Sequence, residues 1–91
     1  MGHDTFAYSS GDQIAYLRRN VISDDKNIIY QLLNVEEYNV GVSGNGELKR
    51  FSHEDIDNAF KKGIENKVSE DILYFLLACL EENSDVIVEF L

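Results

Sequence analysis

The sequence predicts an α+β fold in which a small antiparallel sheet of about three strands packs on three helices, in the order β-β-α-α-α-β. Three observations predict this class. Two alternating segments flank the turn sequence SSGD, three stretches between residues 23 and 83 have helical spacing, and a β-branched run closes the chain. A length of 91 residues predicts one compact domain, residues 1–91, with a thin core.

The first two strands are predicted from alternation on either side of SSGD. The alternating pairs are Phe6 and Tyr8 with Thr5 and Ala7 before the turn, and Ile14 and Tyr16 with Ala15 and Leu17 after it. Gly11 can take the positive φ that a tight turn needs. The segment is therefore expected to form a β-hairpin.

The first helix is predicted over residues 23–34. Ser23 is a suitable N-cap, and the two aspartates that follow it suit the positive end of the helix dipole. The apolar stripe has helical spacing and comprises Ile28, Ile29, Leu32 and Leu33.

The second helix is predicted over residues 52–66, with Ser52 as its N-cap and Asp55 placed to complete a capping box. Gly63 and Asn66 are expected at its end. The third helix begins at Ser69 and is expected to be the most buried of the three. Its stripe comprises Ile72, Leu76, Cys79 and Leu80.

The closing strand is predicted over residues 85–91. Val86, Val88 and Phe90 point one way, and Ile87, Glu89 and Leu91 point the other. Apolar residues on both faces indicate an inner or covered strand, which is expected to join the hairpin.

The charge balance excludes some classes of partner. The chain has 17 acidic and 8 basic side chains, a net charge of −9. This negative charge opposes binding to nucleic acid, which needs clustered Lys and Arg. It allows a basic protein partner, and in that case the chain could act as an inhibitor that masks the basic surface of its partner.

The longest apolar run, residues 72–80, is too short to cross a membrane. The single cysteine and the lack of a signal peptide predict a cytoplasmic location.

The glycine-rich stretch YNVGVSGNGELKRFSHED, residues 38–55, could hold phosphate or only turn the chain. Gly41, Gly44 and Gly46 stand in the reverse order of a dinucleotide fingerprint, and the stretch follows a predicted helix. Turn chemistry is the preferred interpretation. An intermediate alternative is a small hairpin or flap, with NVGV before the turn and ELKRF after it.

The candidate ligand or partner surface comprises His3, Asp4, Tyr38, Ser43, Gly44, Asn45, Gly46 and His53. No catalytic grouping, metal ligand set or cofactor is expected. Cys79 lies on an apolar helix stripe, where a thiol is usually inert, and adjacent His53 and Glu54 lack the spacing of a zinc-binding helix. Five tyrosines exceed what a small core needs, and Tyr38 is the best candidate for an exposed one.

The opening MGHD, the central SGNGE and the following FSHED resemble short uncharacterised bacterial proteins. Members of that group begin Met-Gly-His-Asp, carry a central Ser-Gly-x-Gly element and a Phe-Ser/Thr helix start, and end in a short strand. The resemblance implies a bacterial cytosolic origin. It implies no activity and carries over no functional residue.

The sequence is consistent with two functions and with self-association. The first is a small acidic, non-enzymatic protein-binding or regulatory module, supported by the charge and the tyrosines. The alternative is a metal- or small-ligand-binding protein, with or without enzymatic activity, that uses His3, Asp4 and the 41–47 loop. A homodimer formed through the sheet face or the edge of the last strand is a third hypothesis.

Overall fold

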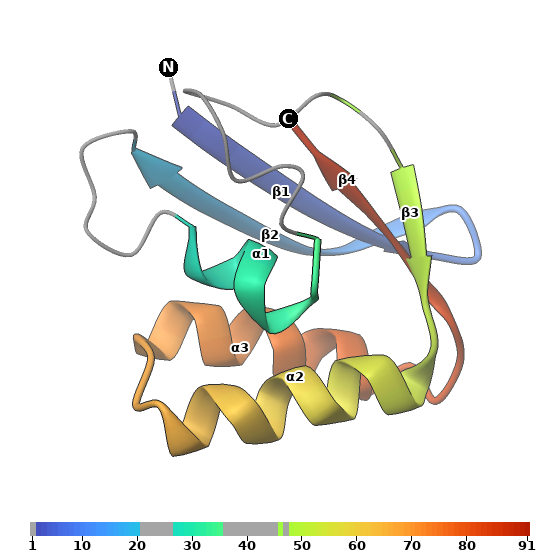
Figure 1. The fold of residues 1–91 in the computed structure, drawn as a ribbon. Helices are drawn as coiled ribbons and strands as arrows, with labels where there is room; N and C mark the ends of the chain where they lie inside the picture. The colour runs from blue at the N-terminus through green and yellow to red at the C-terminus, as the bar shows by residue number, and fades with distance from the viewer. Residues whose placement is uncertain (1, 21–26, 36–45, 47) are drawn as a thin grey trace.

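The computed structural model describes residues 2–20, 27–35, 46 and 48–91. In these ranges it confirms the predicted α+β class (Figure 1). The elements in chain order are β1 (Gly2–Ser9), β2 (Asp12–Asn20), α1 (Ile28–Leu32), β3 (Leu48–Phe51), α2 (His53–Glu65), α3 (Glu70–Leu80) and β4 (Val86–Phe90).

The sheet has four antiparallel strands in the order β2-β1-β4-β3, one more than the three expected. The additional strand is β3, which falls where the flap alternative placed ELKRF. It pairs with β4 from Leu48 opposite Glu89 to Phe51 opposite Val86. The pairing satisfies backbone groups of β4 on the side away from β1.

The closing strand β4 is an inner strand, as predicted. It pairs with β1 on one side and with β3 on the other. The predicted homodimer through the edge of the last strand is therefore wrong, because β1 and β3 already occupy both edges of β4.

The predicted hairpin is confirmed, with a two-residue connection between β1 and β2. Ser10 and Gly11 have φ values of 53° and 86°, so both residues lie in the left-handed region that such turns use. The register shifts between Ala7 and Tyr8, which marks a β-bulge.

Helix α2 follows its local sequence signals closely. Ser52 Oγ accepts from the backbone N–H of Asp55 at 3.1 Å, and the Asp55 carboxylate accepts from the N–H of Ser52 at 3.1 Å, which completes the capping box. Asn66 ends the helix as expected, but Gly63 lies inside it. A Cβ on Gly63 would lie 3.1 Å from Leu73 Cδ2, so the glycine permits close packing of α2 on α3.

The other two helices differ from prediction at their starts. Helix α1 is shorter than the predicted helix 23–34, and Ser23 lies outside the described residues. Ser69 occupies the N-cap position of α3 but makes no capping hydrogen bond with its side chain. Its Oγ accepts instead from Arg19 Nη2 at 2.7 Å, so β2 is joined to the start of α3.

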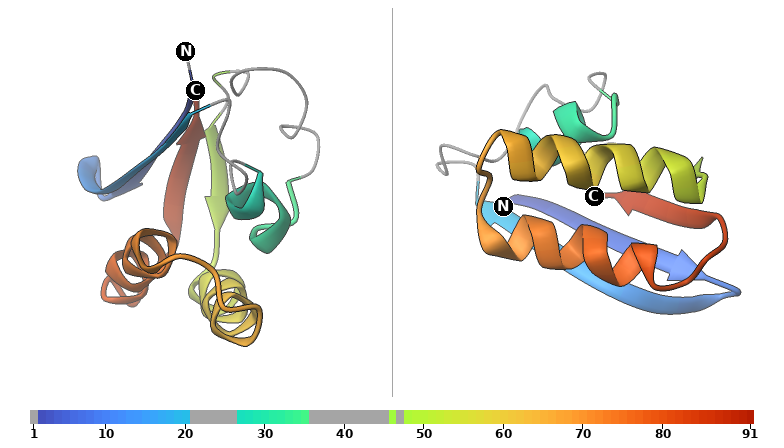
Figure 2. Two further views of the ribbon diagram at one scale, coloured as in Figure 1. Left: turned by 90° about the vertical axis from the view of Figure 1, so that its left-hand side faces the viewer. Right: turned by 90° about the horizontal axis from the view of Figure 1, so that it is seen from below.

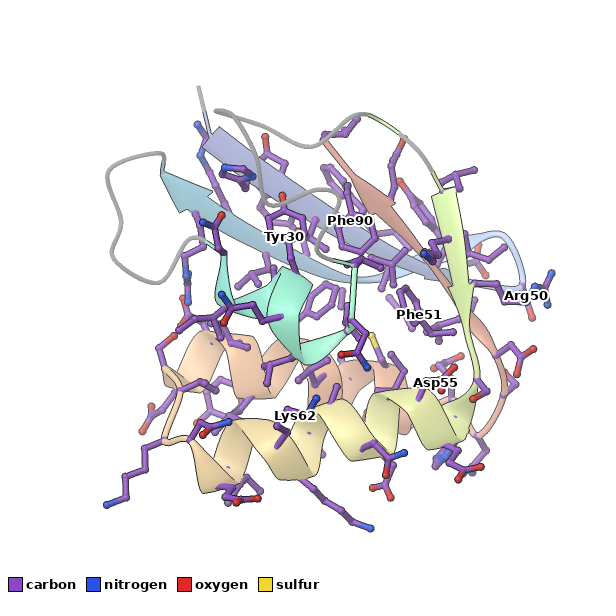
Figure 3. All side chains as sticks on the ribbon, in the orientation of Figure 1. Tyr30, Arg50, Phe51, Asp55, Lys62 and Phe90 are labelled. Atoms are coloured by element: carbon purple, nitrogen blue, oxygen red, sulfur yellow. The ribbon has the colours of Figure 1, made fainter. Side chains whose placement is uncertain are left out.

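The three helices lie on one side of the sheet (Figures 1 and 2). We call the helix-covered side the inner face and the opposite side the outer face. Tyr30 of α1 and Phe90 of β4 are both fully buried, with ring centroids 5.5 Å apart, and point toward each other in Figure 3. Phe51 packs edge-on against Phe90 at 6.4 Å, which joins β3 to the same core.

Strand β1 directs its small and polar residues into the core. The buried residues of this strand are His3, Thr5, Ala7 and Ser9. Phe6 and Tyr8 lie between them in sequence and therefore point to the outer face, where they are partly exposed. Bulky aromatic residues thus lie on the side that the described helices leave uncovered.

Candidate functional site on the outer face of the sheet

The outer face presents side chains from all four strands in rows set by the strand register. One row runs Tyr16, Phe6, Glu89, Leu48, from β2 to β3. The next row runs Gln13, Tyr8, Ile87, Arg50. Tyr16 is 48% exposed and Leu48 is 63% exposed, so the apolar part of this surface is in contact with solvent.

Three aromatic rings form a cluster on the β1–β2 part of this face. The Phe6 ring lies 4.8 Å from the Tyr16 ring, tilted by 33°, and 6.5 Å from the Tyr8 ring, stacked at 26°. These separations are in the range of favourable aromatic pairs. The cluster is therefore a preformed apolar surface with two hydroxyl groups at its margins.

Each tyrosine hydroxyl donates to a carboxylate. Tyr8 Oη donates to Glu89 Oε1 at 2.9 Å, and Tyr16 Oη donates to Asp4 Oδ1 at 2.8 Å. These hydrogen bonds raise the pKa of both tyrosines, because a neighbouring carboxylate stabilises the neutral phenol. The rings are thereby held in place and their phenols stay neutral at physiological pH.

A shallow open groove of about 900 Å³ crosses the outer face between the β1–β2 turn and β3. It is lined by Tyr8, Ser9, Ser10, Gly11, Leu48, Arg50, Ser84, Asp85, Ile87 and Glu89. Arg50 Nη1 lies 3.6 Å from Asp85 Oδ2, and Figure 3 shows its side chain extending outward from β3. The groove thus has an apolar floor, one ion pair on its wall and the Tyr8–Glu89 hydrogen bond.

The structure separates the first two predicted site residues. His3 is buried on the inner face, where its Nδ1 lies 2.5 Å from Tyr30 Oη and the two rings meet edge to face. Asp4 points to the outer face, where it accepts from Tyr16 and lies 3.4 Å from Arg18 Nη1. Adjacent strand residues point to opposite faces, so these two side chains do not share one site.

His53 lies far from His3. It begins α2, directly after the end of β3 that pairs with Val86, and its Nε2 lies 3.3 Å from the carbonyl oxygen of Leu80. The neighbour of His3, Asp4, instead exchanges backbone hydrogen bonds with Leu91 at the other end of β4. The length of β4 thus separates the two histidines, roughly 15 Å along the strand.

Gly46 is the one described member of the predicted loop surface. Its N–H donates to the carbonyl oxygen of Phe90 at 2.7 Å, and its φ of 81° is a conformation that glycine adopts without strain. Tyr38, Ser43, Gly44 and Asn45 lie outside the described residues. Within the described ranges, no group of three or more His, Cys, Asp or Glu residues is arranged to hold a metal ion.

Sequence reasoning did not identify the outer-face cluster as a candidate site. The alternation in residues 5–8 separated Phe6 and Tyr8 from Thr5 and Ala7, but it did not show which pair is buried. The excess of tyrosines was the available signal. It was assigned to Tyr38, whereas Tyr8 and Tyr16 form the aromatic surface that the structure describes.

Comparison of the chain with protein-family models, curated proteins and solved structures gives no match. In the part of the chain that the structure describes, no helix combines the length and the apolar character needed to cross a membrane. The geometry of the outer face is therefore the basis for a functional proposal.

Proposed function

We propose that this protein is a non-enzymatic protein-binding module that binds its partner with the outer face of the sheet. The observation that carries the proposal is the orientation of β1, which buries Thr5 and Ala7 and leaves Phe6 and Tyr8 partly exposed on the outer face. Burial of these aromatic rings by a partner would remove apolar surface from water, the main favourable contribution to association.

The composition of the face supports a protein rather than a small molecule as the partner. The groove is open and shares Tyr8 with the aromatic cluster, so it suits an extended or flat partner surface. Tyrosine is enriched at the energetic centres of protein interfaces, because it contributes a large area with few rotatable bonds. Leu48 provides an aliphatic contact at the other end of the same row.

Selection of a displayed random peptide library against the purified chain tests this proposal. We expect recovered peptides to bind the wild-type protein and to lose about tenfold or more in affinity, measured by calorimetry, on Leu48→Asp. Leu48 is highly exposed, so this change leaves the core intact.

The control is Tyr74→Ser, which removes a side chain that is 64% exposed on α3, a helix that lies on the inner side of the sheet (Figure 1). It should change the affinity by less than about twofold. Peptides that depend on Tyr74 and not on Leu48 would contradict the proposal. Sedimentation at two protein concentrations, with and without Leu48→Asp, shows whether a second copy of the chain is the partner.

A further inference from the structure

We propose that Glu89 is the site at which the outer face receives an arginine side chain from an extended segment of a partner protein. This inference rests on the proposed function and specifies the chemistry of the partner. Three observations support it: the apolar residues that flank Glu89, the absence of an ion pair to it among the described residues although Arg50 of the same face pairs with Asp85, and the flat rings beside it.

Glu89 lies in the middle of the outer face rather than at its rim. In register it is flanked by Phe6 on β1 and Leu48 on β3, and Ile87 precedes it on the same face of β4. The residue is half-buried. Water screens the charge of a half-buried carboxylate less than that of one at an exposed rim position, so its Coulomb attraction for a cation is stronger.

The other two carboxylates described near this row already have arginine neighbours. Asp4 lies 3.4 Å from Arg18, and Asp85 lies 3.6 Å from Arg50. Within the described residues, Glu89 accepts a hydrogen bond from Tyr8 and forms no ion pair. Tyr8 occupies Oε1 and so leaves Oε2 for an incoming donor.

Arginine fits this position better than lysine. A guanidinium can donate to Glu89 while its flat face lies on the ring of Tyr8 or Phe6, whereas an ammonium provides only a compact charge. The stacked arrangement of Phe6 and Tyr8 presents a platform beside the carboxylate. The net charge of −9 would also accelerate the approach of a basic partner.

A titration with N-acetyl-argininamide, followed by amide chemical shifts in ¹⁵N–¹H spectra, tests this inference directly. We expect saturable shift changes at Phe6, Tyr8 and Glu89. Glu89→Gln should weaken this binding about fivefold or more, because it removes the charge and still accepts from Tyr8. N-acetyl-lysinamide should bind the wild type about threefold more weakly than the arginine probe.

Glu81→Gln is the matched control, since it removes the same charge from an exposed position after α3. It should change the affinity by less than about twofold. Shift changes confined to other surfaces, or equal weakening by both variants, would overturn the arginine inference. Library peptides that still depend on Leu48 in that case would leave the proposed function standing. Arginine binding at Glu89 with library peptides indifferent to Leu48 would instead contradict the proposed function.

Discussion

The two faces of β1 differ in burial, and the face with the more apolar side chains is the more exposed one. The inner face carries His3, Thr5 and Ala7, which are almost completely buried, whereas the outer face carries Phe6 and Tyr8, which are partly exposed. Burial in this strand is therefore decided by what packs against each face. A strand whose more apolar residues face solvent has a second surface available for contact.

The inner face of β1 is crowded by bulky residues from other elements. Tyr30 reaches it from α1, and Phe90 projects from the neighbouring strand β4 (Figure 3). Small residues at positions 5 and 7 leave room for these rings, since protein interiors are close-packed. None of the described helices covers the outer face (Figure 2), so the large side chains of Phe6 and Tyr8 meet no described helix there.

The largest difference between the faces is expected from removing a phenylalanine on each. Phe90→Ala should lower the free energy of unfolding by about 3–5 kcal/mol, because it leaves a cavity in the core. Phe6→Ala should lower it by only about 1 kcal/mol, since its ring is already partly solvated. Urea denaturation of the two variants measures both values. Similar losses would show that the outer face is as tightly packed as the inner one.

A smaller difference is expected for the same hydroxyl deletion on the two faces. Tyr30→Phe removes the partner of His3 Nδ1 inside the core and should lower the free energy of unfolding by about 1–2 kcal/mol. Tyr8→Phe removes a hydroxyl at the partly exposed outer face and should lower it by less than about 0.5 kcal/mol. A loss for Tyr8→Phe as large as for Tyr30→Phe would contradict this ranking.

Titration to alkaline pH provides an independent measurement of the burial of the Tyr30 hydroxyl. Burial raises its pKa to about 12 from an ordinary 10.0, with a further contribution from Asp4. Its contribution to stability is therefore present below pH 10.0 and is lost as the pH rises toward about 12. Tyrosinate absorbance should show a late titration step that Tyr30→Phe removes.

The smallest difference concerns two neighbouring arginines of β2. Arg19 donates to both carboxylate oxygens of Asp71 at 2.7 Å and has a side chain only 10% exposed, whereas Arg18 lies 3.4 Å from Asp4 and is 48% exposed. Asp71→Asn should lower the free energy of unfolding by about 0.5–1 kcal/mol, and Asp4→Asn by less than about 0.5 kcal/mol. Thermal denaturation at low and high salt measures both.

The pH dependence of the Asp71 effect has a defined sign. Arg19 holds the pKa of this carboxyl well below its ordinary 3.8. The stabilisation is therefore present above about pH 4 and is lost as the pH falls through the lowered folded-state pKa. Wild type and Asp71→Asn should converge in stability under strongly acidic conditions. A constant difference between them down to the lowest pH would exclude the ion pair as its cause.

Local sequence signals predicted the elements whose causes are local. The capping box of Ser52 and Asp55 set the start of α2, and Gly11 set the tight turn of the hairpin. Gly63 was misplaced at a helix end, because its true requirement is the approach of Leu73 from α3. That contact joins separate elements and leaves no trace in the local sequence.

The candidate site was less accessible to prediction. Glu89 and Phe6 are 83 positions apart in sequence and become neighbours only through the pairing of β1 with β4. The additional strand β3, Leu48–Phe51, is too short for periodicity to distinguish it from a loop. Its pairing with β4 defines it as a strand. The prediction that His3 and Asp4 belong to one surface is wrong, because strand geometry places their side chains on opposite faces of the sheet.

The order of residues along the chain was sufficient for the α+β class, the hairpin turn, the start of α2 and the alternating faces of β4, since each depends on contacts within a few residues. The strand order β2-β1-β4-β3 and the choice of which face of β1 is covered depend on long-range pairing and on the space left by Tyr30 and Phe90. Alternation specifies two faces but assigns neither to the core, because burial is a property of the neighbours.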